Sequence, residues 1–153
     1  RGGIRRLSAM KKLFDTSVLV AAMVEAHPAH VRSLHAFQRS LKDGQGWVGT
    51  HSVAELFAVL TRMPVSPRIG PDLAHRLIQD NIESSSLNLV ALETSDYFAV
   101  LERMTEFGLA GGVIYDALIL QSACKAQVDE IITLNEADFV RISSGLAIRI
   151  VAP

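Results

Sequence analysis

The hydrophobic and polar positions of the chain form short apolar runs that alternate with longer segments of helical periodicity. The short runs are rich in Val, Ile and Leu and lack regular polar alternation, which is typical of strands buried on both faces of a parallel sheet. We expect strands at residues 11–14, 46–50, 87–92, 130–134 and 147–151.

Between these strands, apolar residues recur at intervals of three and four, as on one face of a helix. The pattern predicts helices at residues 15–26, 27–44, 51–62, 72–84, 95–107 and 113–126, and a turn or short helix at 135–139. Asp15, Thr16 or Ser17 could cap the first helix, Pro28 suits the first turn of the second, and Gly44 ends it. Strands that alternate with helices predict an α/β fold whose parallel sheet is covered on both faces.

Three carboxylates stand alone inside apolar segments. Asp15 lies in "LFDTSVLVAAMV", Glu55 in "HSVAELFAVL" and Asp116 in "GGVIYDALIL". Asp15 or Asp116 could merely cap a helix, and Glu55 could pair with an arginine. An ionised carboxylate removed from water costs several kcal/mol unless something pairs with it, however, and three such residues in one small protein suggest a shared partner.

These carboxylates are expected to meet at one edge of the sheet. Asp15 ends the first strand, Asn135 and Asp138 follow the fourth, and Glu55 and Asp116 fall in the first turns of helices that begin near the same edge. In open parallel sheets, ligands bind outside the carboxyl ends of the strands.

Clustered carboxylates must hold protons or bind a cation, and Mg²⁺ takes one or two carboxylates and several waters. Such an ion activates water and stabilises charge on a phosphodiester oxygen. The pattern therefore predicts metal-assisted phosphodiester hydrolysis.

Composition narrows the class of protein. The chain has 153 residues, 49% of them hydrophobic, which fits one domain with a sizeable core. A net charge of −1 argues against a plain nucleic-acid binder, although not against an enzyme that reaches RNA through metal and local arginines. With one cysteine no intrachain disulfide can form, which favours a reducing cytoplasm as the compartment. No apolar run approaches the roughly 20 residues that a membrane span needs.

The amino-terminal residues 1–9 precede Met10, and we interpret them as an added leader or a misassigned start. Residues 10–153 then form a single domain. Lys11 and Lys12 before an apolar stretch imitate a signal peptide, but Asp15 interrupts that stretch.

Other motifs carry less weight. "GQGWVG" fits G-x-G-x-x-G but follows a helix instead of a strand, which argues against dinucleotide binding. His27, His30 and His35 lack the spacing of a zinc site and are interpreted as a solvated helix face. Cys124 is expected to be a buried small hydrophobe.

Four segments, "LFDTSVLVA", "SVAELFAVLTRMP", "YDALIL" and "TLNEADF", resemble in order and spacing the motifs of PIN-domain ribonucleases, especially the toxins of VapBC-type toxin–antitoxin pairs. The resemblance covers residues 11–152. It implies an α/β/α sandwich with a central parallel sheet of about five strands, and an endoribonuclease that depends on Mg²⁺ or Mn²⁺.

The resemblance also implies roles for individual residues. It assigns catalytic and metal-binding roles to Asp15, Glu55, Asp116 and Asp138, and supporting roles to Ser17, Thr133 and Asn135. Asn135 stands where some relatives carry an aspartate, and Asp138 is the available substitute for that fourth carboxylate.

An RNA substrate, a cognate antitoxin and a homodimer are implied in the same way, with no membrane partner. The helices at 51–62 and 72–84 are candidates for a dimer face or an antitoxin groove. The arginines that could contact phosphates are Arg62, Arg68, Arg76 and Arg103.

Two alternative functions compete with this interpretation. A non-catalytic binding module of the same fold usually loses one or more carboxylates, whereas this chain keeps the first three. An aspartyl-phosphate phosphotransfer domain needs a second aspartate near the first and a lysine late in the chain. Here Ser17 stands two residues after Asp15, and the only lysine beyond residue 42 is Lys125, inside a predicted helix.

Overall fold

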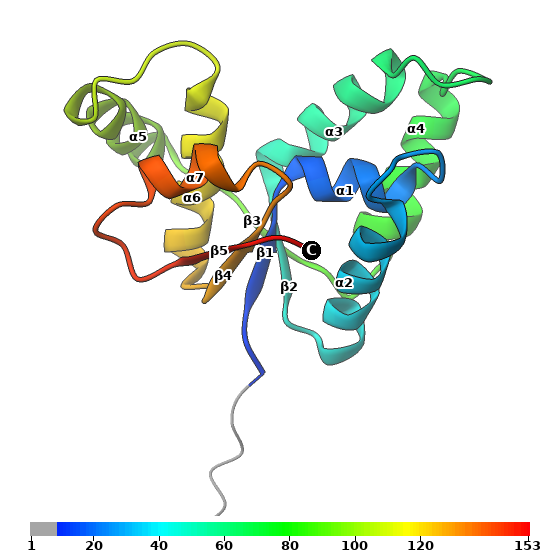
Figure 1. Cartoon of the computed structure of the whole chain (residues 1–153), viewed down its shortest axis with the longest axis horizontal. Helices are drawn as coiled ribbons and strands as arrows, with labels where there is room; N and C mark the ends of the chain where they lie inside the picture. Colours follow the sequence, from blue (N-terminus) through cyan, green and yellow to red (C-terminus); the bar gives the residue numbers. More distant parts are fainter. Residues whose placement is uncertain (1–8) are drawn as a thin grey trace, which may run out of the picture.

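The computed structural model describes residues 9–153, so the interpretation of the leader lies outside the described residues apart from Ala9. Five parallel strands form one sheet in the order β3-β2-β1-β4-β5 (Figure 1). They are β1 (Lys12–Phe14), β2 (Gly46–Gly49), β3 (Asn88–Val90), β4 (Glu130–Ile132) and β5 (Arg149–Val151). Each lies within a predicted strand, and the expected parallel sheet is confirmed.

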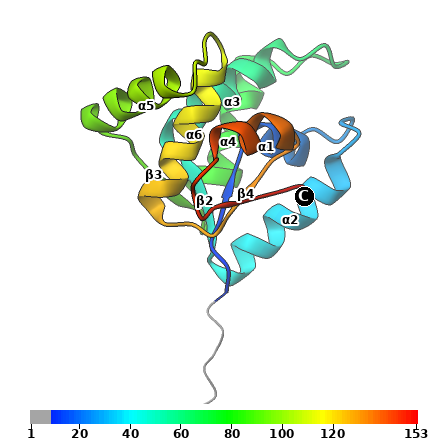
Figure 2. The same ribbon diagram turned by 60° about the vertical axis from the view of Figure 1, so that its left-hand side comes forward.

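Helices cover both faces of the sheet. They are α1 (Thr16–Met23), α2 (His30–Asp43), α3 (Thr50–Arg62), α4 (Pro71–Ile78), the π-helical turn η1 (Gln79–Glu83), α5 (Thr94–Glu106), α6 (Val113–Ala126) and α7 (Glu136–Ile142). α1 to α4 lie on one side of the sheet and α5 to α7 on the other, and the turned view in Figure 2 agrees. The molecule is the α/β/α sandwich that the family resemblance implies.

Two sequence-based expectations about helices were wrong. Pro28 is not in the first turn of α2, since this helix begins at His30. It lies in a preceding turn, in which the Ala29 N–H donates to Nδ1 of His27. Glu55 is in the second turn of α3, since this helix begins at Thr50, directly after β2. Gly44 does end α2, with a left-handed φ of 70° that suits glycine.

Successive residues of the central strands pack alternately against the two helical layers. Phe14 and Ile132 pack with the helices of the α1–α4 side, whereas their neighbours Leu13 and Ile131 pack with α5, α6 and α7. Side chains of a strand point to opposite faces in turn, so a strand between two layers needs apolar residues at every position. This explains the unbroken apolar runs.

The strand order creates a crevice at the carboxyl edge of the sheet. From β1 the chain moves to β2 on one side, while β4 pairs on the other side of β1. The carboxyl ends of β1 and β4 therefore flank a topological switch point, the usual ligand position in such sheets. No helix of the described residues is long and apolar enough to cross a membrane.

Candidate metal and RNA site

Asp15 lies at the switch point, directly after β1, and its side chain is buried. Its Oδ2 accepts hydrogen bonds from the Ser17 hydroxyl at 2.6 Å and the Thr133 hydroxyl at 2.8 Å. Burial raises the pKa of Asp15 even though both hydrogen bonds act to lower it. Asp15 occupies the N-cap position of α1 but makes no side-chain cap hydrogen bond, so capping does not explain it.

Glu55 faces the same crevice from α3 and is half-buried. The Thr16 hydroxyl donates to its Oε2 at 3.1 Å. Burial, and then the charge of Asp15, raise the pKa of Glu55. The sequence analysis predicts Thr16 only as a possible helix cap, whereas the structure places its hydroxyl in the site, and its position next to Asp15 in the sequence is the signal for this role.

Asp116 completes the central group from the first turn of α6. Its pKa is raised to about 6, first by burial and then by the negative charges of Asp15, Asp138 and Glu55. Repulsion of this kind requires that Asp15, Glu55 and Asp138 each lie within electrostatic range of Asp116. The structure thus brings together carboxylates from distant parts of the sequence. Asp138 is the exposed member of the group and lies on α7.

The supporting residues form a second layer of hydrogen bonds around Asp15. The Leu134 N–H donates to Oγ of Ser17 at 3.2 Å, and the Asn135 N–H donates to Oγ1 of Thr133 at 2.9 Å. Both hydroxyls are therefore held by the backbone after β4. Asn135 contributes its main chain, while its side chain is exposed and makes no cap hydrogen bond.

The chemistry of this donor set fits a hard divalent cation. The side-chain hydrogen bonds to Asp15 fall on Oδ2 and the one to Glu55 falls on Oε2, so within residues 9–153 no side-chain donor occupies the other oxygen of either carboxylate. In the same part of the chain, no three His, Cys, Asp or Glu side chains lie close enough together to hold a metal ion as they stand. Carboxylate oxygens are the ligands that Mg²⁺ prefers, and this ion uses one or two carboxylates while it keeps several waters.

A cleft with a volume of about 920 Å³ opens beside Glu55, between α3, α5 and α6. His51, Tyr97 and Tyr115 contribute to its walls, and Arg62 lies in the same lining. Sequence patterns did not reveal this cleft, because its walls come from helices far apart in the chain.

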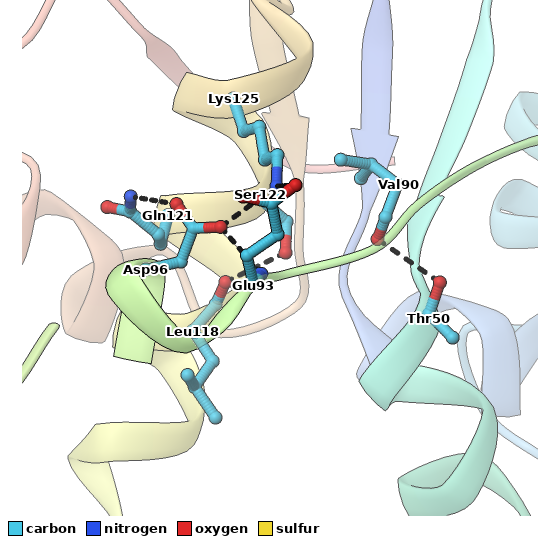
Figure 3. A network of polar contacts seen from close by, with 8 residues as sticks. All are labelled: Thr50, Val90, Glu93, Asp96, Leu118, Gln121, Ser122 and Lys125. Carbon is cyan, nitrogen blue, oxygen red and sulfur yellow. Dashed lines mark hydrogen bonds and ion pairs between the residues drawn. The ribbon is translucent and has the colours of Figure 1, made fainter. Parts of the chain in front are cut away.

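Polar contacts hold the α5 and α6 walls together (Figure 3). Gln121 donates to Oδ1 of Asp96 at 3.0 Å, and Nζ of Lys125 lies 2.9 Å from Oδ2. Lys125 is therefore engaged at a helix contact, and the phosphotransfer alternative has no support from it.

Two other expectations need correction. The Arg103 guanidinium donates to the carbonyl oxygens of Ile142 and Ser144, so it ties α5 to the end of α7 and is not a free phosphate contact. Cys124 is partly exposed instead of buried.

The family model for the PIN domain matches residues 12–144. The chain is a member of the PIN-domain family. Among curated proteins, this PIN-domain chain is similar to Ribonuclease VapC40 of Mycobacterium tuberculosis, with 33% identity over 105 residues that cover 69% of the chain and 72% of the relative. Ribonuclease VapC27 of the same organism is 29% identical over 117 residues, covering 75% and 78%.

The fold is also similar to solved structures. VapBC2 from Rickettsia felis, bound to a DNA fragment from its promoter, superposes with a TM-score of 0.65 at 19% identity, covering 92% of this chain and 98% of the other. At that identity the likeness supports the fold, and the family assignment rests on the PIN-domain match and on VapC40.

Proposed function

We propose that this PIN-domain protein is a metal-dependent endoribonuclease, the toxin of a VapBC-type toxin–antitoxin pair. The observation that carries the proposal is the convergence of Asp15, Glu55 and Asp116 at the switch point, in a chain whose relatives are named ribonucleases. Three half-buried or buried acids that repel one another are a costly arrangement, and a bound cation removes that cost.

Asp15, Glu55, Asp116 and Asp138 would hold Mg²⁺ or Mn²⁺. A bound ion of this kind activates water and stabilises charge on the phosphodiester oxygens during in-line displacement. Ser17 and Thr133 fix the position of Asp15 through Oδ2, and Thr16 fixes Glu55 through Oε2, which leaves the other oxygen of each carboxylate without a side-chain donor.

The partners follow from the same assignment. The substrate is RNA, and a cognate antitoxin keeps the nuclease inactive in the cytoplasm, as the resemblance to the toxins of VapBC-type pairs implies. A homodimer or antitoxin contact would use the outward side of α3 and α4, where Phe57 and Leu73 expose apolar surface.

Cleavage of RNA by the purified, antitoxin-free chain tests the proposal. We expect cleavage of total RNA with Mg²⁺ or Mn²⁺, none with EDTA, and a loss of at least about 100-fold in Glu55→Gln because a ligand is removed. Asp80→Asn is the matched control, since Asp80 is exposed on η1 and makes no hydrogen bond or ion pair within the described residues. Equal activity of wild type and Glu55→Gln would refute the assignment.

A further inference from the structure

A positively charged hollow lies on α2, outside the carboxylate site. It has a volume of about 490 Å³, and its lining consists of Pro153 and five side chains of α2: Arg32, His35, Gln38, Arg39 and Lys42. No carboxylate side chain lines it, although the chain as a whole has a net charge of −1. The basic character is therefore local to this surface. We call Arg32, His35, Arg39 and Lys42 the α2 cationic face.

The α2 cationic face is the outward side of an anchored helix. Its members follow one another at intervals of three and four residues, so they form one stripe about 15 Å long. The opposite side of α2 is buried, and Phe37 packs edge to face against Phe14 with ring centroids 5.6 Å apart. The stripe is thus held in a fixed place, with its side chains exposed to solvent.

Helix stability does not account for these charges. Arg32 lies in the first turn of α2, where the helix dipole favours acids, and that turn contains no acid. Arg39 and Lys42, three residues apart, repel one another. Asp43 is the one acid of α2; it accepts the Gln45 N–H at 3.0 Å, and no ion pair of residues 9–153 includes a residue of α2. A stripe of unpaired cations is typical of a surface that binds an anionic partner.

The hollow is connected to the carboxyl edge of the sheet through the residues after β5. The carbonyl oxygen of Val151 accepts the N–H of Thr133, whose hydroxyl donates to Asp15. Pro153, which lines the hollow, is two residues farther along and therefore lies within about 7 Å of Val151. Both views show this end of the chain beside α2 (Figure 1, Figure 2). A strand of RNA that leaves the carboxylate site on this side would pass over Pro153 onto α2.

The chemistry of the lining identifies the anion. Arginine binds a phosphate through two N–H groups at once, and lysine and glutamine side chains also donate to phosphate oxygens. A protein partner would need apolar anchors at the centre of the contact, whereas every α2 residue of this lining is charged or polar. No Phe, Tyr or Trp lines the hollow, so an RNA base would find no such ring to stack on. The lining therefore suits the sugar–phosphate backbone.

We propose that the α2 cationic face is an exosite that binds the phosphate backbone of the substrate RNA outside the segment that is cut. The inference rests on the proposed nuclease function and adds to it the surface that holds the RNA beyond the carboxylate site. Backbone contacts carry no base sequence, so the exosite contributes affinity and orientation.

Salt-dependent binding tests the exosite without cleavage. The protein is the full chain with Asp116→Asn, in EDTA, and the probe is a labelled RNA hairpin with single-stranded flanks. The triple variant joins Arg32→Gln, Arg39→Gln and Lys42→Gln. We expect it to reduce the slope of log K against log salt by about two to three, since each phosphate contact contributes about one. Affinity should fall at least about tenfold at about 0.1 M salt. An unchanged slope and affinity would overturn the inference.

Two matched variants separate a local contact from the effect of overall charge. Arg32→Lys with Arg39→Lys keeps the charges and should keep the salt slope, with a smaller loss of affinity, because lysine lacks the paired N–H groups. The other restores the net charge of the triple variant by neutralising three exposed acids of α4 and η1: Asp72→Asn, Asp80→Asn and Glu83→Gln. It should bind RNA as weakly as the triple variant does. Full recovery of binding would indicate long-range attraction instead of a contact and would overturn the inference.

Cleavage kinetics in the active chain test the connection to the carboxylate site. Two RNAs with the same cut are compared, one with long flanks and one trimmed to the nucleotides around the cut. We expect the triple variant to raise the KM of the long RNA at least about fivefold with kcat unchanged, since a contact away from the cut binds ground and transition states alike. The trimmed RNA should be cut equally well by both proteins. An equal rise in KM for both RNAs would place these side chains at the cut and refute the exosite.

The outcomes distinguish this inference from the function on which it rests. If wild type cuts no RNA but the triple variant still loses salt-dependent binding, the nuclease proposal fails and the α2 cationic face stands as an RNA-binding surface. If wild type cuts RNA with metal and the triple variant matches it in salt slope and KM, the exosite fails and the nuclease stands. If the triple variant loses the co-expressed antitoxin in a pull-down but matches wild type on RNA, the face is a protein contact and the inference is wrong.

Discussion

Replacing Asp116 by asparagine should stabilise the metal-free protein at neutral pH while destroying its function. The pKa of Asp116 rises from 3.8 to about 6, first because of burial and then because of the neighbouring carboxylates. A change of that size corresponds to about 3 kcal/mol. Because the carboxyl is only half-buried, solvent screening reduces this to about 1–2 kcal/mol.

The sign of the effect depends on pH. A raised pKa in the folded state means that stability is fully present below pH 3.8, where the carboxyl is protonated in both states, and is lost as the pH rises through about 6. Asparagine carries no charge at any of these values. The gain in stability from Asp116→Asn should therefore be about 1–2 kcal/mol larger at pH 8 than at pH 4.

Thermal unfolding in EDTA measures this difference. For a chain of this length, 1–2 kcal/mol corresponds to about 2 to 8 °C in Tm. Adding Mn²⁺ should raise the Tm of wild type and have a much smaller effect on Asp116→Asn, since binding to the folded state stabilises it. Asp80→Asn serves as the control and should show the same shift at both pH values. A variant that is less stable than wild type at pH 8, or equally shifted at pH 4 and pH 8, would refute the repulsion on which this reasoning depends.

Three further predictions concern the scaffold around the site. Thr133→Val should lower the free energy of unfolding by about 1–3 kcal/mol in urea titrations, since a buried hydrogen bond to Asp15 is lost. Thr133→Ser keeps the hydroxyl and should retain most of that free energy, and equal values for the two variants would contradict this. Phe14→Ala should cost about 3–5 kcal/mol because it leaves a cavity in the core, and a cost below 1 kcal/mol would show that the ring is not packed as described. Arg103→Gln should reduce the melting temperature with unchanged KM for RNA, whereas Arg62→Gln should raise KM with unchanged stability; the opposite pattern would place Arg103 at the RNA.

The sheet and its carboxyl edge could be predicted from local sequence. The short apolar run before Asp15 predicts a buried strand, and the alternation of strands with helices predicts a parallel sheet. Once the sheet is parallel, Asp15 and Thr133 must emerge at the same edge. Their direct hydrogen bond also needs β1 and β4 to be neighbours, a strand order that local sequence did not predict, and the role of Thr133 was implied by the family resemblance.

The contacts between helices could not be predicted in the same way. The link from Arg103 to the carbonyls at Ile142 and Ser144 depends on how α5 packs against α7. The unpaired nitrogens of His51 depend on the approach of α3 to the end of β2, which no periodicity encodes. Side-chain positions of this kind follow from packing, and packing is shared among residues distant in sequence.

Proton release on metal binding tests the central claim most directly. Binding of Mn²⁺ to the antitoxin-free chain is measured by calorimetry at pH 6 in buffers of different ionisation enthalpy, and again at pH 8. Because the pKa of Asp116 is about 6, we expect at least about half a proton to be released per bound ion at pH 6 and less at pH 8. Asp116→Asn should release fewer protons than wild type at pH 6, since only Asp15 and Glu55 can still lose one. Failure of wild type to bind Mn²⁺, or binding with the same proton release in Asp116→Asn, would contradict a metal site built from these carboxylates.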